Sequence, residues 1–443
     1  MSSTIFRRAT VISDGEARQA DVIIDGQDIA ALAPAGSNLH CDNEVDAGGL
    51  LLLPGVIDEH VHFRDPGMTA KADTSTESRA AAAGGVTSFM DMPNTRPATT
   101  TLEALDAKYA NAADKSLVNY SYYFGATNHN APLFASLDKR TVCGIKLFMG
   151  SSTGDMLVDD DNALRSVFEG TDMIVAAHCE DTARVTRNAA AMRATYGDDV
   201  PVACHSLIRD EEACYRSTAK AVELADRYGT RLHVMHLSTA RELTLFDPAP
   251  LDTKRITAEA CLAHLLFTTD DYDALGARIK CNPSVKSPSD RQALRQALTT
   301  GRIDTVATDH APHLLADKEG GALGAASGMP MLQFSLISML DLVEQGIISQ
   351  TEVVEKMCHA PARLYHVHKR GFIREGYRAD IVLVAPQDWT LTSHDVVSKC
   401  GWSPLEGHTF HHRVVQTYVN GRLVYDNGRF DDSARGQRLT FDY

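Results

Sequence analysis

The sequence predicts an α/β protein whose middle is a (β/α)₈ barrel of the TIM type and whose two ends together form a small β-sandwich. Three observations support this fold class. Short apolar runs recur along the middle of the chain, helix-like stretches lie between most of them, and both ends are rich in β-branched residues. Strands that alternate with helices over roughly 250 residues are typical of such a barrel.

The two ends of the chain carry hairpin signals. Val22–Ile29 contains a β-branched run, a tight turn and a second short run, which predicts a hairpin. Near the other end, Ala379–Val384 and Val414–Val424 have the same character, and the second contains the Asn420-Gly421 dipeptide, a strong turn signal. We therefore expect residues 1–54 and 366–443 to form the β-sandwich, around a barrel built from residues 55–365.

The middle of the chain provides the eight expected barrel strands. Helix-like stretches such as Thr74–Ala83 and Glu211–Tyr228 separate them. A doubly wound sheet would need a phosphate-binding Gly-x-Gly-x-x-Gly after its first strand, which the sequence lacks there. Gly320–Gly328 is typical of a mobile loop. The expected strands are Gly55–Val61, Val86–Met90, Tyr120–Phe124, Val142–Phe148, Met173–Ala177, Leu232–Met235, Ile256–Cys261 and Ile303–Ala307.

Composition limits the kind of partner. The 443 residues include 43 Lys and Arg against 58 Asp and Glu, a net charge of −15, which disfavours nucleic acid as a partner but not a small anion. No apolar run reaches the roughly 18 residues of a membrane span, and the first residues lack a signal peptide's apolar stretch. Nine cysteines without a Cys-x-x-Cys pair indicate reduced thiols. We expect a cytoplasmic protein that acts on a small molecule, with no membrane partner.

Side chains that can bind a metal ion stand at the ends of five of these strands. His60 and His62 follow the first run, and residues two apart on a strand face the same way, so both point inward. Barrel active sites are built at the carboxyl ends of the strands, where all of these side chains meet. Imidazoles and a carboxylate without thiolate suit Zn²⁺ best, with Mn²⁺, Co²⁺ or Fe²⁺ as alternatives. The other members of this set are Lys146, His178, His236 and Asp309.

Each of these residues alone has a simpler explanation. A single histidine such as His178 is more often a hydrogen-bonded core residue than a ligand, and Asp309 could cap a helix or form an ion pair. Lys146 is the exception, because a buried lysine without a partner is costly. Independent accidents at five strand ends do not readily coincide, so the metal interpretation is favoured.

Two segments resemble the signature segments of the dihydroorotase family, in the amidohydrolase superfamily. They are Asp58–Gly67 and Ala307–His313, the second followed five residues later by Lys318. The resemblance spans essentially the whole chain. Supporting segments are Met92–Thr95, Cys281–Ser284 and Lys399–Gly407.

The resemblance implies a binuclear metal centre, expected here as two Zn²⁺. Lys146 would bridge the two ions after reacting with CO₂ to form a carbamate. Some dihydroorotases use an aspartate as the bridge, and Asp155 and Asp159–Asp161 keep that alternative open. Lys146 is favoured because it ends an apolar run. The other ligands would be His60, His62 and Asp309 for the more buried ion, and His178 and His236 for the more exposed one.

The activity implied is the reversible hydrolysis of L-dihydroorotate to N-carbamoyl-L-aspartate in de novo pyrimidine biosynthesis. A metal-bridged hydroxide would attack the ring amide, and Asp309 would act as general base and then as general acid toward the ring nitrogen. Arg64 stands two residues after His62, so its side chain should face inward like those of the two histidines. It would form a forked pair with the ring carboxylate. Further substrate contacts implied by the family pattern are Asn94, Asn282 and His313.

Several alternatives remain. Arg64 on its own could form a strand-end salt bridge with Asp58 or Asp65. Allantoinases and dihydropyrimidinases share the scaffold, but allantoinases usually carry Asn in place of Arg64 and lack His313, and dihydropyrimidinases lack both features. An inactive dihydroorotase-like scaffold subunit would have lost metal ligands, which are all present here. A homodimer is the family-level expectation.

Other polar residues are expected to play structural roles. His264 has no remaining ligand position, His310 should point away from the site by strand alternation, and Cys179 is expected to pack. The segment Gly320–Pro330 departs from the loop of the common bacterial family members. Its best candidates for substrate contact are Ser327 and Gly328.

Overall fold

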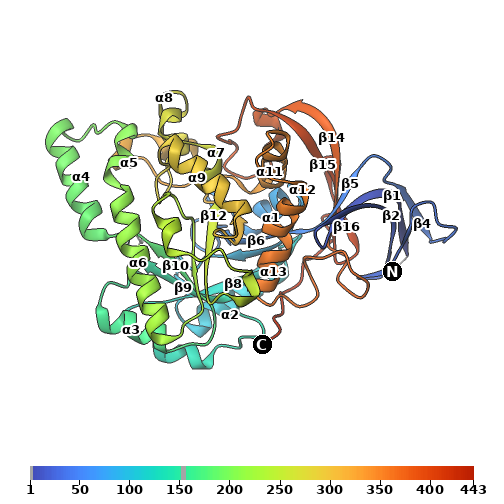
Figure 1. The fold of residues 1–443 in the computed structure, drawn as a ribbon, viewed down its shortest axis with the longest axis horizontal. Coiled ribbons are helices and arrows are strands. Elements are labelled where there is room, and N and C mark those ends of the chain that lie inside the picture. The colour runs from blue at the N-terminus through green and yellow to red at the C-terminus, as the bar shows by residue number, and fades with distance from the viewer. Residues whose placement is uncertain (1–2, 151–155) are drawn as a thin grey trace.

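The computed structural model describes residues 3–150 and 156–443, which form two β-sheets (Figure 1). The first sheet has eight parallel strands in chain order, and every predicted apolar run overlaps one of them. A bridge between Val61 and His310, with the His62 N–H donating to the His310 carbonyl over 2.8 Å, joins the first strand to the segment after the last. The predicted barrel is thereby confirmed. Its strands are β6 (Val56–Val61), β7 (Val86–Asp91), β8 (Asn119–Gly125), β9 (Gly144–Met149), β10 (Val175–Cys179), β11 (Leu232–Val234), β12 (Ile256–Cys261) and β13 (Thr305–Ala307).

Helices surround the barrel, and their ends follow local capping chemistry. The helices α1 (Thr74–Ala83) and α6 (Glu211–Tyr228) have the predicted bounds. Asp73 and Asp210 accept backbone N–H groups of the first turn, and Gly229 ends α6 at a left-handed φ of 73°. The remaining α-helices of the described residues are α2 (Leu102–Ala113), α3 (Asp161–Glu169), α4 (Thr182–Tyr196), α5 (His205–Ile208), α7 (Leu262–Leu266), α8 (Tyr272–Leu275), α9 (Pro288–Thr299), α10 (Gly321–Gly324), α11 (Ser335–Glu344), α12 (Gln350–Val354) and α13 (Ala360–Leu364).

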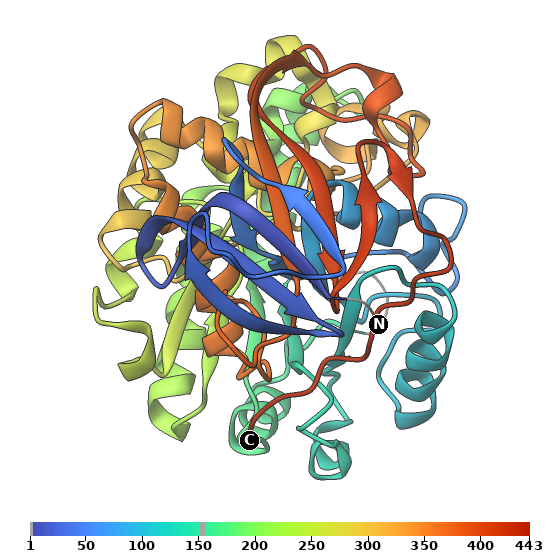
Figure 2. The ribbon, with the colours of Figure 1, turned by 90° about the vertical axis from the view of Figure 1, so that its right-hand side faces the viewer.

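The second sheet is made from both ends of the chain, as predicted (Figure 2). Its nine strands form one continuous sheet, in the order β17-β16-β15-β14-β5-β1-β2-β3, with β4 beside β1. The predicted turns are present, and Asn420 and Gly421 have the positive φ values, 51° and 75°, that a two-residue hairpin turn needs. The strands are β1 (Thr4–Ser13), β2 (Glu16–Asp25), β3 (Asp28–Pro34), β4 (Asn43–Asp46), β5 (Leu51–Pro54), β14 (Ile381–Thr390), β15 (Thr409–Val419), β16 (Arg422–Asp426) and β17 (Arg429–Phe430).

Side chains from both ends share one apolar core in this sheet. Leu52 of β5 pairs with Leu383 of β14, and the Phe6 ring meets the Tyr418 ring edge-on at 5.0 Å between centroids. Each such fully buried side chain contributes roughly 1.5–3 kcal/mol. Neither end can bury these side chains alone, so the two ends depend on each other.

A buried carboxylate ties the sheet to the barrel. Asp380, just before β14, accepts the Asn420 N–H over 2.8 Å and the Asn119 side-chain amide of β8 over 3.2 Å. Arg370 forms an ion pair with the same carboxylate, and both side chains are almost fully buried. The sheet is therefore joined to the barrel at the start of β8, at the amino end of this strand. Within the described part of the chain, no helix is both long and apolar enough to cross a bilayer.

Candidate active site

All ten predicted site residues line one cavity at the carboxyl ends of the barrel strands. Its volume is about 360 Å³, within the range of small-ligand pockets. Ser327 and Gly328 line it as well, together with three apolar side chains. The predicted residues are His60, His62, Arg64, Asn94, Lys146, His178, His236, Asn282, Asp309 and His313.

Three of these residues have an unusual backbone conformation. Arg64, His236 and Asp309 have φ values of 64°, 42° and 47°, in the left-handed region that residues with a side chain rarely adopt. Such conformations persist only where the surrounding structure holds them, and they cluster at functional sites. The strand ends are thus bent so that these three side chains face the cavity.

The first group of candidate ligands consists of two histidines and a carboxylate. The Nε2 atoms of His60 and His62 lie 3.3 Å and 3.0 Å from Asp309 Oδ1. Each Nδ1 atom faces an acceptor at 2.8 Å, which is Glu259 for His60 and Asn94 for His62. Because the outer nitrogens carry the hydrogens, the lone pairs of both inner nitrogens point at the carboxylate oxygen. Three converging lone pairs fit a bound cation.

The electrostatics of this group agree with that fit. Burial lowers the pKa of His60, but the charges of Glu259 and Asp309 outweigh it and raise this pKa above its ordinary value. Burial raises the pKa of Asp309, but the neighbouring His60 and His62 outweigh burial and hold this pKa far below its usual range. The carboxylates therefore favour positive charge at His60, whether a proton or a metal ion, whereas burial outweighs Asp309 at His62 and lowers its pKa.

The second group of candidate ligands consists of two further histidines. The Nδ1 atom of His178 lies 2.9 Å from the Nε2 atom of His236. The other ring nitrogen of His178 lies 2.9 Å from a Glu180 carboxylate oxygen, which also pairs with Arg209. Burial lowers the pKa of both imidazoles. Both are therefore held neutral, the form that binds metal.

Lys146 lies between these two groups without a carboxylate partner. Its side chain is almost fully buried, and its Nζ lies 3.1 Å from the Met235 sulfur and 4.6 Å from the centre of the Phe148 ring. Among the described residues no ion pair reaches it. Burial lowers the pKa of Lys146 to about 8, against the opposing charges of Glu259 and Asp309. A neutral amine is consequently accessible near physiological pH.

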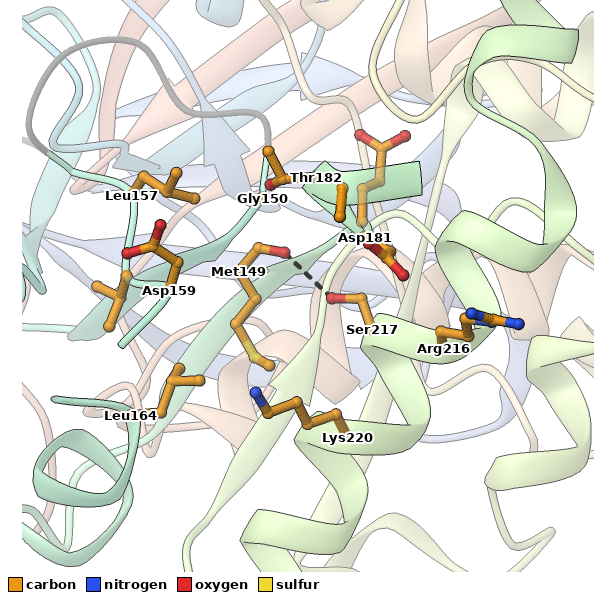
Figure 3. A pocket seen from close by; sticks show the side chains of 13 residues that line it. Met149, Gly150, Leu157, Asp159, Leu164, Asp181, Thr182, Arg216, Ser217 and Lys220 are labelled. Atoms are coloured by element: carbon orange, nitrogen blue, oxygen red, sulfur yellow. Dashed lines mark hydrogen bonds between the residues drawn. The ribbon is translucent and has the colours of Figure 1, made fainter. Parts of the chain in front are cut away.

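The aspartates considered as an alternative bridge lie elsewhere. Asp159 lines a separate cavity beside β9 and α6, where Figure 3 shows it near Met149, whose carbonyl accepts the Ser217 hydroxyl over 3.1 Å. Asp160 caps α3, and Asp161 forms an ion pair with Lys220. None of these three lines the site cavity. Asp155 lies outside the described residues.

Arg64 is a buried cation without a carboxylate partner in the described chain. It is 8% exposed, and its Nε donates to the Pro312 carbonyl over 3.1 Å. The alternative salt bridge with Asp58 or Asp65 does not form, and Asp58 accepts the Thr308 hydroxyl instead, over 2.6 Å. Burial lowers the pKa of Arg64 to about 10, so it stays charged at neutral pH. An unpaired buried guanidinium facing a cavity indicates a site for an anionic group.

Asn282 and His313 line the cavity on the side of the segment that follows β13. Asn282 Oδ1 lies 3.1 Å from His205 Nε2. His313 Nε2 lies 3.0 Å from Arg64 Nη2 and 3.1 Å from the Ser327 carbonyl.

The segment Gly320–Gly328, predicted as a mobile loop, contains the short helix α10. Buried Lys318 donates to the carbonyls of Lys280, Ala326 and Gly328 over 3.1, 2.7 and 2.7 Å. These bonds hold the end of the segment, with Ser327 and Gly328, against the cavity.

Other histidines have the structural roles expected. His264 contacts the Pro283 carbonyl at 3.0 Å, and His310 contacts Glu77 at 2.8 Å, away from the cavity. The sequence analysis missed Glu180 and Glu259. Glu180 stands two residues after His178, so strand parity could have indicated it. Glu259 is a charged residue inside an apolar run, and such residues are rarely buried unless they are paired.

Comparisons with known proteins support one family. The Amidohydrolase family model matches residues 51–424. The chain is 37% identical to a dihydroorotase of Halobacterium salinarum, over 95% of this chain and 96% of that protein. It is 33% identical to an allantoinase of Bacillus velezensis, over 98% and 97% of the two chains. An L-hydantoinase (dihydropyrimidinase) from Arthrobacter aurescens has a TM-score of 0.94 at 27% identity, over 99% and 100% of the chains. These relatives are named for different substrates.

Proposed function

The chain belongs to the amidohydrolase family, and within this family of hydrolases we propose that it acts as a dihydroorotase. It would interconvert L-dihydroorotate and N-carbamoyl-L-aspartate, the reaction of de novo pyrimidine biosynthesis. The observation that carries this choice is Arg64, a buried guanidinium in the site cavity with no carboxylate partner in the described part of the chain.

The substrate carboxylate is what distinguishes dihydroorotate from related rings. Allantoin and dihydrouracil have no carboxylate and would leave Arg64 unpaired, whereas a forked guanidinium–carboxylate pair compensates its burial. Asn94 can add a donor, because its oxygen faces His62 and, among the described residues, no acceptor meets its amide nitrogen. The proposed substrate thus supplies the charge that this wall of the cavity lacks.

The donor set fits two divalent cations, proposed here as Zn²⁺. The histidines and Asp309 would hold them, with Lys146 as the bridge after carboxylation. When bound, such ions lower the pKa of water and polarise the carbonyl under attack. The neutral amine of Lys146 would form a bond to the carbon of CO₂ while one C–O π bond opens, and an N–H proton would pass to water, which leaves an anionic carbamate in place of the neutral amine.

Asp309 would move the proton. Its carboxylate is ionised, since His60 and His62 hold its pKa far below the usual range despite burial. It can accept the proton of the attacking water and return it to the departing ring nitrogen. Arg64 would meanwhile hold the far end of the ring. Ring opening creates a carboxylate, so high pH should favour hydrolysis and low pH cyclisation.

The test is an assay of zinc-loaded protein in bicarbonate buffer with L-dihydroorotate, allantoin, dihydrouracil and hydantoin. We expect chelator-sensitive turnover of dihydroorotate alone. Arg64→Met should raise KM for dihydroorotate strongly, and Arg64→Lys, which keeps the charge but loses the fork, should restore only part of the affinity. Turnover of only the rings without a carboxylate would replace the proposed substrate. No turnover with metal bound would favour the inactive scaffold.

A further inference from the structure

We propose that Lys71 is a positioning residue that sets the preference of this site for anionic rings. It would fix the tautomer of His313 and so keep the Arg64 guanidinium free for the substrate carboxylate. The proposal deepens the proposed function and rests on it for the identity of the anion. It starts from one contact, in which the Lys71 ammonium lies 2.9 Å from His313 Nδ1.

Two neighbours on opposite sides of the His313 ring favour the same tautomer, whereas Arg64, a donor 3.0 Å from Nε2, favours the other. Lys71 is paired with Asp317 at 3.1 Å, and its ammonium can only donate, so His313 Nδ1 must accept. The Ser327 carbonyl, 3.1 Å from His313 Nε2, can only accept, so it favours a hydrogen on Nε2, and the bond from Lys71 to Nδ1 makes this the tautomer of the neutral ring. Burial and the charges of Arg64 and Lys71 lower the pKa of His313 to about 2, which keeps the ring neutral.

The tautomer decides what Arg64 can do. Its Nη2 lies 3.0 Å from His313 Nε2, and with a hydrogen on both atoms no hydrogen bond joins them. In the opposite tautomer Nε2 would offer a lone pair, and this Nη2 donor would be used inside the protein. Within the described chain the only other acceptor on this guanidinium is the Pro312 carbonyl, which faces Nε. Lys71 thereby leaves the Nη donors available to a ligand.

Lys71 acts through His313 rather than on the substrate. It lines a neighbouring cavity that shares Arg64, Asn94 and His313 with the site, and it does not line the site cavity itself. Its ion pair with Asp317 is partly exposed, and such pairs contribute little to stability. Replacement of Lys71 should therefore leave the fold intact while it changes the anion site.

The test compares Lys71→Met, Lys71→Arg and the control Lys139→Met, which removes an exposed lysine paired with Asp172 away from the site. The first readout is long-range ¹⁵N–¹H spectroscopy of histidine-labelled protein, with His313 assigned by its loss in His313→Gln. We expect hydrogen on Nε2 in the parent, in Lys71→Arg and in the control. In Lys71→Met we expect it to move to Nδ1, because the charged Arg64 donor 3.0 Å from Nε2 then outweighs the neutral Ser327 carbonyl at the same nitrogen.

The second readout is steady-state kinetics with dihydroorotate. In Lys71→Met, KM should rise about tenfold, the scale of one charge-assisted hydrogen bond, with kcat near the parent value. Lys71→Arg should recover most of this loss, and the control should match the parent. An unchanged tautomer in Lys71→Met overturns the proposal, and so does a changed tautomer with an unchanged KM. If the parent does not turn over dihydroorotate, the proposed function fails while the spectra still decide the role of Lys71.

Discussion

Replacement of Glu259 by glutamine should weaken metal binding by about 100-fold. One oxygen of this buried carboxylate accepts the His60 ring N–H over 2.8 Å and the His236 backbone N–H over 2.9 Å. It therefore orients one candidate ligand of each group. Glutamine keeps the shape and one acceptor oxygen but removes the negative charge.

The magnitude follows from those two hydrogen bonds. A hydrogen bond to a charged acceptor contributes about 1.5–3 kcal/mol, and one to a neutral acceptor contributes about 0.5–1.5 kcal/mol. The substitution by glutamine therefore weakens each of the two bonds by a little over ~1 kcal/mol. Two bonds lose about 2–3 kcal/mol, which at about 1.4 kcal/mol per factor of ten corresponds to roughly 30- to 140-fold. The higher value applies where both histidines lose their orientation fully.

The assay is a competition of parent and Glu259→Gln for Zn²⁺ against a coloured chelator, followed by kcat at saturating Zn²⁺. We expect weaker binding with a substantial part of kcat recovered at high metal concentration. Glu242→Gln is the matched control, because Glu242 is equally buried and is bonded to Thr218 and Thr239 away from the cavity. A Zn²⁺ affinity of Glu259→Gln within threefold of the control would refute the assigned orienting role.

Three further predictions test the proton carrier, the bridge and the support of the barrel. Asp309→Asn should lower kcat by about 10²–10⁴-fold in both directions of the reaction, measured by ring absorbance, and near-normal turnover would contradict its role. Reactivation of metal-free protein by Zn²⁺ at a constant concentration of dissolved CO₂ should speed up with pH and level off above about 8, because only the neutral amine of Lys146 reacts with CO₂. A flat profile would exclude it as the bridge. Asp380→Ala should lower the free energy of unfolding by about 3–5 kcal/mol in urea, because it leaves Arg370 buried and unpaired, while KM of the folded protein stays unchanged.

The barrel could be predicted because its strands are fully buried. Strands covered on both faces form continuous apolar runs, so each run is visible in the sequence without its partners. The runs Ile256–Cys261 and Gly55–Val61 agree with β12 and β6 to within a residue. The sequence did not predict that the second sheet is continuous, because this depends on the pairing of Leu52 with Leu383, which lie far apart in the chain. Strand propensity indicates that a segment is a strand but not which strand it pairs with.

The candidate ligands could be predicted because the end of a strand and the alternation of side chains along it can both be recognised in the local sequence. His60 and His62 needed only their spacing and the end of an apolar run. The groups that orient them required the fold, since Glu259 lies 199 positions from His60 in the chain. Lys71 is the extreme case, because nothing in its local sequence indicates a contact with His313, 242 positions away.

The arrangement of charge in the cavity argues for a substrate with two unlike ends. Asp309 and Arg64 carry opposite charges in one cavity, yet no ion pair joins them in the described structure. Their left-handed backbones direct them apart, Asp309 toward His60 and His62 and Arg64 toward Pro312 and His313. One wall thus gathers lone pairs that attract a cation, and the other presents a cation that attracts an anion. A ring with a cleavable amide at one end and a carboxylate at the other matches both walls at once, whereas a neutral ring matches only the first.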